Sequence, residues 1–252
     1  AEMMGVPLSH VTAKLGDSTF PETPGSGGQA GAASATAGVY AACAKLRELV
    51  AQRLGFNTTD VTFADGRVGS AGRSVPLADA AKDEEIVAED FMEYGDLNKE
   101  YAQQTVGAHF AEVAVDAYTG AVRVRRMLAI CAAGRILNPI TARSQVIGGM
   151  TMGIGAALME EMAVDTRFGF FVNHDLAGYE VPVHADVPHL DAHFIDEVDA
   201  TMSPLKAKGV GELGLVGVAP AIANAVYNAT GVRVREYPVT LDKHLAGLPE
   251  IA

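Results

Sequence analysis

The chain has 252 residues, of which 49% are hydrophobic and 20% charged, a balance typical of a globular protein with an ample core. Its formal net charge of −12 argues against a nucleic-acid partner, because phosphates are bound by clustered lysine and arginine residues. The nearest approach to such a cluster, Arg123, Arg125 and Arg126, lies in a strand-like run and indicates a solvated face. No apolar run approaches the roughly 18 residues of a membrane span.

The first residues, AEMMGVP, resemble the last turn of a helix that stops at Gly5 with Pro7 just beyond. We therefore expect the chain to be a piece of a longer protein, whose missing N-terminus conceals any export signal. Residues 9–17 are strand-like, and residues 17–31 form a loop rich in proline, glycine, serine and threonine.

An α+β pattern continues through the next segments. Apolar residues recur every three or four positions from 32 to 54, which predicts a helix that stops at Gly55. Residues 59–75 predict a short hairpin around the sequence ADGR. Residues 79–104 are the most acidic and polar part of the chain, and we interpret them as a polar surface excursion.

The second half of the chain predicts one hairpin and two helices. Residues 109–130 alternate apolar and polar side chains around a central Thr-Gly pair, which is a hairpin signal. Residues 137–162 begin like a helix, with Asn138 as N-cap and Pro139 at the first helical position. A proline and a glycine bracket the last predicted helix, over 220–231.

Four glycines interrupt the helix predicted over 137–162. Each costs about 0.8–1 kcal/mol relative to alanine in a helix interior, so something must come close enough to need bare backbone. Close packing of another helix or strand is one explanation, and a bound cofactor is the other. The four are Gly148, Gly149, Gly153 and Gly155.

The two cysteines, Cys43 and Cys131, lie far apart in apolar, alanine-rich stretches. This setting favours two buried free thiols over a disulfide. The chain has no CxxC pair, so the usual spacing for an iron–sulfur cluster is missing. Reduced thiols fit the cytoplasm, and a periplasmic location stays open.

One carboxylate, Glu212, stands in the small and apolar run GVGELGLVG that follows Lys208. Such an acid is either exposed at a turn or held for chemistry. Apolar, poorly hydrated surroundings would raise the pKa of a glutamate above its usual value of about 4.3 and make it a better base. Nearby lysines or a helix N-terminus would oppose that shift.

Motifs for several other chemistries are missing. The stretch GSGGQAG at 25–31 has neither the register of a dinucleotide-binding loop nor the GK[ST] of a P-loop, and no GxSxG elbow occurs. Three histidines, His184, His189 and His193, lie close in sequence. Solvated or core histidines are favoured over a zinc site, because Pro188 interrupts the helix that would bring them onto one face.

Three segments in collinear order resemble the molybdenum-binding subunit of the xanthine dehydrogenase and aldehyde oxidase family, the molybdenum hydroxylases. They are residues 1–43, GRILNPITARSQVIGGMTMGIGAALMEE at 134–161, and KGVGELGLVGVAPAIANAVYNATG at 208–231. The resemblance identifies residues 1–252 as the C-terminal cofactor-binding domain of that subunit. It implies an α+β fold with mixed sheets, packed helices and glycine-rich loops.

The resemblance also implies a cofactor and a reaction. The cofactor is molybdenum on molybdopterin, in bacterial members usually the cytosine dinucleotide form, and the metal has no protein side chain as ligand. The reaction is hydroxylation of an aldehyde or N-heterocycle at an electron-poor carbon, with oxygen derived from water. Glu212 matches the glutamate of the family's GVGE motif, which acts as general base. Iron–sulfur clusters and FAD are expected on other domains or subunits.

Further positions match the family's cofactor-contacting segments. The loop GSGGQ departs from the commoner form rich in threonine and serine, so the side chain that bonds the cofactor stays open. Gln145 falls where the family has a glutamine near the pterin, although a plain helix-surface glutamine fits as well. The implied cofactor-binding residues are Ser26, Gly27, Gly28, Gln29, Gln145 and Gly211.

Two other interpretations of the sequence stay open. A piece that lacks half of the cofactor site is expected to be inactive alone, and it could serve only as a structural or cofactor-assembly domain. A glycine-rich binding domain unrelated to molybdenum would require the long collinear match to be accidental.

Overall fold

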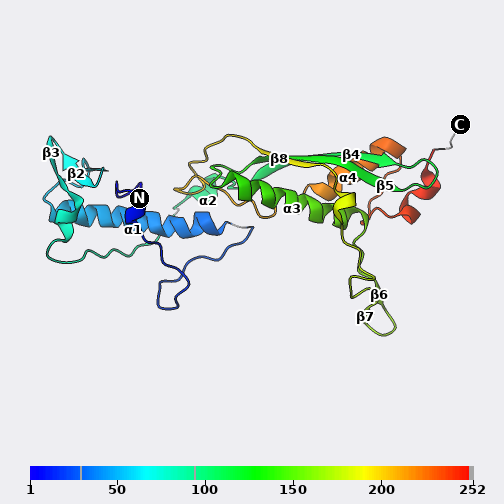
Figure 1. Ribbon diagram of the computed structural model, residues 1–252, viewed down its shortest axis with the longest axis horizontal. Coiled ribbons are helices and arrows are strands. Elements are labelled where there is room, and N and C mark those ends of the chain that lie inside the picture. Colours follow the sequence, from blue (N-terminus) through cyan, green and yellow to red (C-terminus); the bar gives the residue numbers. More distant parts are fainter. Residues whose placement is uncertain (29, 94, 250–252) are drawn as a thin grey trace. The chain divides into compact units, whose positions relative to one another are not determined.

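The computed structural model describes residues 1–28, 30–93 and 95–249 and divides the chain into two compact units (Figure 1). Unit 1 comprises Ala1–Ser26, Gly31–Gln103 and Ala200–Leu205. Unit 2 comprises Gly27–Ala30, Gln104–Asp199 and Lys206–Ala252. The assignment of 1–252 to one cofactor-binding domain stays a prediction, because a division by compactness does not say where a cofactor binds.

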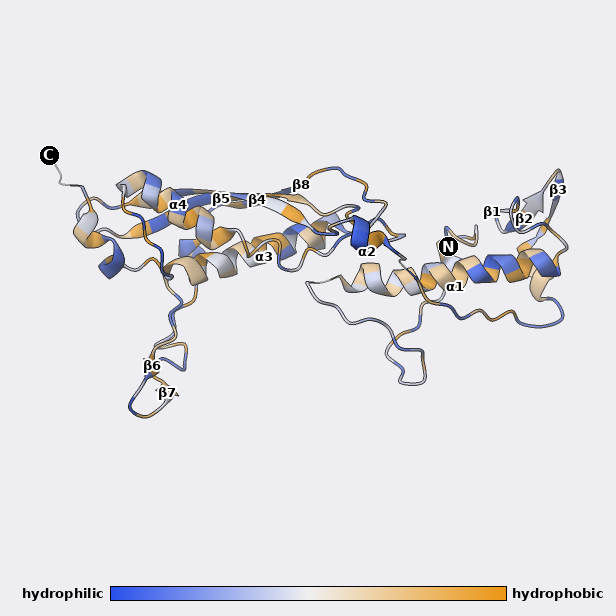
Figure 2. Ribbon diagram, turned by 180° about the vertical axis from the view of Figure 1, so that it is seen from behind, coloured by the Kyte–Doolittle hydropathy of each residue, from blue (hydrophilic) through white to orange (hydrophobic). Residues whose placement is uncertain are grey.

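Unit 1 consists of one long helix and a small antiparallel sheet. The helix, α1 (Gly31–Arg53), confirms the helix predicted over 32–54, and Gly55 follows it with a φ of 69°. Figure 2 shows that its N-terminal half is pale to hydrophobic and that hydrophilic residues gather in its C-terminal half. That half packs through Val50 against Phe63 and Val68 of the sheet.

The sheet of unit 1 has the order β1-β2-β3. Its strands are β1 (Thr62–Ala64), β2 (Arg67–Ser70) and β3 (Arg73–Pro76). Asp65 and Gly66, between β1 and β2, both have positive φ angles, 50° and 68°. This is the turn that matches the twist of a two-residue hairpin, and it confirms the hairpin predicted around ADGR.

The strand predicted over 9–17 is wrong. A single 3₁₀ turn spans Leu8–His10, and the residues after it pair with no strand in the part of the chain that the structure describes. Val11 is 44% exposed and Leu15 is 88% exposed. Alternation stabilises a strand only when one face is buried and a partner completes the ladder, and neither condition holds here.

The polar stretch 79–104 is largely irregular. Two short helices lie at its ends, a 3₁₀ helix over Leu77–Ala81 and α2 (Leu97–Glu100). Ala80 is buried and Ile86 packs against the unit 1 core, while most residues between 82 and 93 are exposed.

Unit 2 is built on a mixed three-stranded sheet of order β4-β5-β8. β4 (Val106–Val115) and β5 (Val122–Ala132) form the predicted antiparallel hairpin, and β8 (Leu190–Phe194) runs parallel to β5. This mixture of antiparallel hairpins, one parallel pair and helices confirms the α+β class. The exposed arginines Arg123, Arg125 and Arg126 confirm the predicted solvated face.

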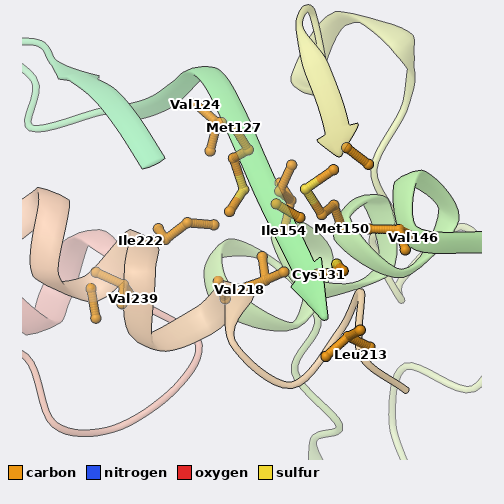
Figure 3. Close-up of a cluster of buried hydrophobic side chains, with 14 of the residues drawn as sticks. Val124, Met127, Cys131, Val146, Met150, Ile154, Leu213, Val218, Ile222 and Val239 are labelled. Atoms are coloured by element: carbon orange, nitrogen blue, oxygen red, sulfur yellow. The ribbon is translucent and has the colours of Figure 1, made fainter. Parts of the chain in front are cut away.

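Two helices cover the core side of this sheet. They are α3 (Pro139–Leu158) and α4 (Val218–Thr230), which begins two residues before Pro220. Figure 3 shows the side chains that these elements bury together. They include Val124, Met127, Cys131, Val146, Met150, Ile154, Val218 and Ile222. Cys43 and Cys131 are both free thiols; Cys131 is buried as predicted, whereas Cys43 is only half-buried.

Local signals explain where α3 begins. The Asn138 side-chain oxygen accepts hydrogen bonds from the amides of Ile140 and Thr141, at 3.1 and 3.2 Å, and Pro139 takes the first helical position. These bonds satisfy amides that a helix start otherwise leaves without partners. The predicted cap is therefore confirmed.

Close packing accounts for three of the four glycines in α3. A Cβ at Gly149 would lie 2.8 Å from the backbone of Gly214, and one at Gly153 would lie 2.5 Å from the Val218 side chain. A Cβ at Gly155 would overlap Glu160 and lie 2.7 Å from Pro182. For Gly148, no described atom lies within 4 Å. Protein packing, rather than a cofactor, thus explains most of the predicted close approach.

A short arm leaves unit 2 after α3. It contains the two-stranded pair β6 (Val164–Asp165) and β7 (Phe170–Phe171), which Figure 1 shows away from the sheet of unit 2. Over the described ranges, none of the helices is long and apolar enough to cross a lipid bilayer.

Candidate functional site

The candidate site is built around the Glu212 loop, residues 208–217, which lies in unit 2 and leads into α4. Leu213 is buried in the core cluster (Figure 3), whereas the neighbouring Glu212 side chain is exposed. The carbonyl of Glu212 accepts the amides of Leu215 and Val216, at 3.0 and 3.2 Å. Glu212 therefore opens a turn that its neighbour anchors in the core.

The loop packs backbone to backbone against Gly28, far away in sequence. The amide of Gly211 donates to the carbonyl of Gly28 at 3.0 Å, and a Cβ at Gly209 would stand 2.6 Å from the same oxygen. A Cβ at Gly28, where φ is 58°, would lie 3.7 Å from Oε2 of Glu212. Bare backbone at these glycines thus places the carboxylate beside the Gly28 turn.

Two side chains hold the carbonyls of the same loop. The half-buried side chain of Gln145 on α3 donates from Nε2 to the carbonyl of Gly211 at 3.2 Å. The Thr105 hydroxyl donates to the carbonyl of Gly209 at 2.8 Å. The structure therefore brings together four of the residues predicted from the sequence: Gly28, Gln145, Gly211 and Glu212.

The remaining predicted residues belong to the GSGGQ stretch. In unit 1, Oγ of Ser26 accepts the amide of Gly31 at 2.9 Å, at the first residue of α1. In unit 2, no described atom lies within 4 Å of a Cβ placed on Gly27. The predicted role of Gln29 falls outside the described residues.

An ion cluster fixes the start of the Glu212 loop. The side chain of Lys208 is only 9% exposed, and its Nζ lies 3.0 Å from Glu197 and 3.1 Å from Asp199. Glu197 also accepts the amide of Gly134 at 2.7 Å, and the Lys208 and Gly134 bonds hold the pKa of its carboxyl below the usual value. The positive charge of Lys208 is thus matched by carboxylates that sequence reasoning missed.

Burial and pairing act in opposite directions on Lys208. Burial lowers the pKa of its ammonium group, and the hydrogen bonds to Glu197 and Asp199 outweigh burial, so that the pKa is raised. Lys208 therefore stays charged at neutral pH. The only advance signal for this cluster was a lysine at the edge of an apolar run.

A histidine on β4, His109, contacts the other end of the loop and was also missed. A Cβ on Gly217 would overlap its ring. Burial lowers the pKa of His109, and a hydrogen bond with the backbone of Gly214 opposes that shift. The neutral form of the ring is therefore favoured at pH 7.

Protein metal ligands do not gather at this site. Among the residues that the structure describes, no three histidine, cysteine, aspartate or glutamate side chains are placed to hold a metal ion. His193 instead lies 3.1 Å from Asp191. A groove of about 960 Å³ on the sheet is lined by charged groups such as Arg126 and Arg143, and no predicted site residue lines it.

Comparisons with known proteins agree with the family resemblance. The model of the molybdopterin cofactor-binding domain family matches residues 1–188. The aldehyde oxidoreductase molybdenum-binding subunit PaoC of Escherichia coli (strain K12) is 62% identical over 251 residues, which cover 100% of this chain and 34% of PaoC. A xanthine dehydrogenase molybdenum-binding subunit of Escherichia coli O157:H7 is 41% identical over 147 residues, 56% of this chain and 19% of that protein.

Solved structures show the same fold. Quinoline 2-oxidoreductase from Pseudomonas putida 86 superimposes with a TM-score of 0.73 at 22% identity, over 98% of this chain and 34% of that one. Aldehyde oxidoreductase from Desulfovibrio gigas gives a TM-score of 0.51 at 34% identity, over 57% of this chain and 15% of that one. The chain thus spans about a third of the length of PaoC and of the quinoline enzyme.

Proposed function

Because the chain belongs to the family of molybdopterin cofactor-binding domains, we propose that it forms one wall of the cofactor site of a molybdenum hydroxylase, with Glu212 as general base. The observation that carries this proposal is the isolation of the carboxylate. Within the described ranges, Glu212 makes no side-chain hydrogen bond or ion pair, while the backbone on both sides of it is fixed. A carboxylate without a partner, carried on a fixed backbone, is available to accept a proton.

The residues present leave room for a bulky cofactor on the exposed side of the loop. The Gly28 turn and the Glu212 loop offer bare backbone, and Gly27 leaves open space where a side chain would otherwise stand. Gly27, Gly28 and Gly211 would line the cofactor. Gln145 would hold Gly211 in place through its hydrogen bond to the Gly211 carbonyl. Ser26 and Gln29 are proposed from the family resemblance alone.

When bound, the molybdenum cofactor supplies two-electron oxidation chemistry and an oxygen atom derived from water. Glu212 removes the proton from the attacking oxygen and thereby makes it a better nucleophile. The turn that starts at Glu212 fixes the backbone from which the carboxylate projects, which lowers the entropic cost of reaching the reactive geometry.

The substrate is an aldehyde or an N-heterocycle, and the 62% identity with an aldehyde oxidoreductase subunit favours an aldehyde. We propose the cytosine dinucleotide form of the cofactor, and iron–sulfur and FAD-containing partners that remove the electrons. The cytoplasmic location stays a prediction from the two free thiols.

The test is Glu212→Gln in the complete enzyme with its partner subunits. The amide keeps the shape of the side chain and cannot act as the base, so molybdenum content should stay at the wild-type level while turnover falls by roughly 10²–10⁴-fold. Anaerobic reduction of the enzyme by an aldehyde isolates this step from later electron transfer. Reduction within a few-fold of the wild-type rate would show that Glu212 is not the base.

A non-catalytic structural or cofactor-assembly role for this chain predicts different results from those of a molybdenum hydroxylase. In that case the complete subunit, purified from cells that make the cofactor, contains no molybdenum or pterin nucleotide. For residues 1–252 expressed alone, we expect no stoichiometric molybdenum, because the chain supplies only one wall. Near-equimolar molybdenum on this piece would overturn that expectation.

A further inference from the structure

The arm that leaves unit 2 after α3, residues 160–183, is closed at its base against that helix. The amides of Met159 and Glu160 both donate to the carbonyl of Gly155, at 2.9 Å each. A Cβ on Gly155 would overlap Glu160 and lie 2.7 Å from Pro182, so the two ends of the arm meet at this glycine. The missing side chain at 155 therefore lets the chain leave α3 and return beside the same turn.

Side-chain bonds fix the shape of the arm between these ends. The hydroxyl of Tyr179 donates to Oε2 of Glu160 at 2.8 Å. Oδ1 of Asn173 accepts the amide of Ala163 at 2.9 Å, and Nδ2 of the same side chain donates to the carbonyl of Glu161. Together with the pairing of β6 and β7, these bonds make the arm an ordered projection.

This ordered arm holds large apolar side chains in solvent. Phe168 is 74% exposed and Leu176 is 81% exposed, and about half of each of the side chains of Phe170, Phe171 and Val172 is exposed. Burying aromatic side chains of this size is strongly favourable. A run of such residues that stays exposed on an ordered element marks an interaction surface.

The charges at the tip of the arm indicate what kind of contact it makes. Between positions 165 and 172 the sequence has one acid and one base, and these pair, with Nη2 of Arg167 2.8 Å from Oδ2 of Asp165. The guanidinium of Arg167 also lies 5.3 Å from the centre of the Phe168 ring. Apolar surfaces with balanced charge are typical of permanent contacts, whereas charge complementarity steers partners that exchange.

The length of the related subunits indicates the partner. PaoC aligns with 100% of this chain, the arm included, and the aligned part covers only 34% of PaoC. The larger remainder of such a subunit is tethered to the arm by the chain itself. Tethering gives the remainder a high effective concentration, which neither a second copy nor a separate subunit has.

We propose that the arm 160–183 docks on the remainder of the same subunit, which receives the side chains of Phe168, Phe170 and Phe171 in an apolar pocket. The contact holds unit 2 against the part of the subunit that supplies the other wall of the cofactor site. This inference rests on the proposal that the chain is one part of a longer molybdenum-binding subunit, and it does not depend on Glu212.

The test places p-benzoylphenylalanine at position 168 of the complete enzyme. This residue keeps the aromatic ring of Phe168 and, on irradiation, bonds to C–H groups next to it. We expect a cross-link to a peptide of the same subunit outside residues 1–252, located by mass spectrometry, and no added mass on a denaturing gel. A cross-link to an iron–sulfur or flavin subunit, a cross-link to a second copy, or no cross-link would overturn the proposal.

The matched control carries the same photoreactive residue at position 118. Tyr118 is an aromatic residue that is 83% exposed, and it lies in the turn between β4 and β5 rather than in the arm. It should form no cross-link to the remainder of the subunit. Equal cross-linking from positions 118 and 168 would mean that exposed aromatic residues are covered without preference, and would overturn the special role of the arm.

Hydroxyl-radical footprinting gives a second readout that needs no substitution. In the native complete enzyme, Phe168, Phe170 and Phe171 should lose almost all of the oxidation that they show in the urea-unfolded enzyme, whereas Tyr118 should keep most of it. An arm that is oxidised as readily as Tyr118 would overturn the docking and leave the role of Glu212 untouched. Conversely, a wild-type rate of reduction in Glu212→Gln would remove the proposed base without changing the cross-link or the footprint.

Discussion

The two glycine-rich stretches at 25–28 and 209–217 look alike in sequence and differ in their surroundings. In the first, a Cβ on Gly25 or Gly27 would meet no described atom within 4 Å. In the second, a Cβ on Gly209 would stand 2.6 Å from the carbonyl of Gly28, and one on Gly214 would stand 2.5 Å from the carbonyl of Val146. Glycine therefore permits close packing in one stretch and leaves open space in the other.

This difference distinguishes the glycines that hold the candidate site in place from the glycines beside which a ligand would lie. The Glu212 loop needs its glycines so that backbone can approach backbone, and that approach fixes the loop that carries the carboxylate. In the first stretch, Gly28 takes part in that approach, whereas Gly25 and Gly27 have no such packing to explain them. Changes in the two stretches should therefore affect different properties, folding in one case and cofactor binding in the other.

The largest effect on folding is expected from Gly214→Val. Its new side chain would meet the backbone of Val146 in α3, which cannot move aside as a flexible side chain could. Overpacking of a core typically costs about 1–3 kcal/mol and occasionally more, and we expect the upper end here. Thermal unfolding measures the loss.

Gly25→Ala is the matched control for that experiment. Its Cβ would stand in open space, so the change in the free energy of unfolding should stay within about 0.5 kcal/mol. If Gly214→Val melts within about 2 °C of the wild type, the packing explanation of the second stretch is wrong.

A smaller loss is expected from Lys208→Met, which removes the cation at the start of the Glu212 loop. Glu197 and Asp199 would then face each other without it, and losing hydrogen bonds to charged groups costs roughly 1.5–3 kcal/mol. Lys206→Met, two residues earlier and exposed, is the control and should be close to neutral. Equal melting temperatures for the two variants would contradict the anchoring role.

The Lys208 cluster also predicts a pH dependence. The pKa of Glu197 is lowered from its ordinary value of 4.5 by the bonds from Lys208 and Gly134. A lowered folded pKa means that this stabilisation is complete above pH 4.5 and is lost as the pH falls through the folded pKa. The difference in melting temperature between wild type and Lys208→Met should therefore shrink in acid. A constant difference down to pH 3 would indicate that Glu197 is not the partner that matters.

The elements that could be predicted from the sequence are those decided within a few residues. Asn138 and Pro139 start α3 through local bonds, and Asp65-Gly66 favours a tight turn because both residues tolerate positive φ angles. Glu212 stood out because a carboxylate in a small, apolar run is rare. The strand expected over 9–17 failed because a strand depends on a partner, and sequence alternation does not supply one.

The supports of the candidate site could not be predicted in the same way. His109 reaches the Glu212 loop only when β4 lies beside Gly217, and Glu197 meets Lys208 only when the segment after β8 lies against the start of that loop. Each is an ordinary residue in its own segment. The sequence also could not tell close packing from ligand binding as the reason for the α3 glycines. The structure separates the two, because Gly149 faces Gly214 and Gly148 faces no described atom.

The smallest effect on stability is expected at Gly148 and Gly149 in α3. In Gly148→Ala, the new methyl group enters open space at an exposed position of the helix, so the variant should be more stable by about 0.5–1 kcal/mol. Gly149→Ala should be less stable, because its Cβ would lie 2.8 Å from the Gly214 backbone. Thermal unfolding, measured on the 252-residue chain and on the complete subunit, checks both expectations.

If Gly148→Ala stabilises the chain but lowers cofactor content or stability in the complete subunit, then Gly148 is covered there by a group that this chain does not contain. Stabilisation in both settings would make Gly148 a plain surface glycine.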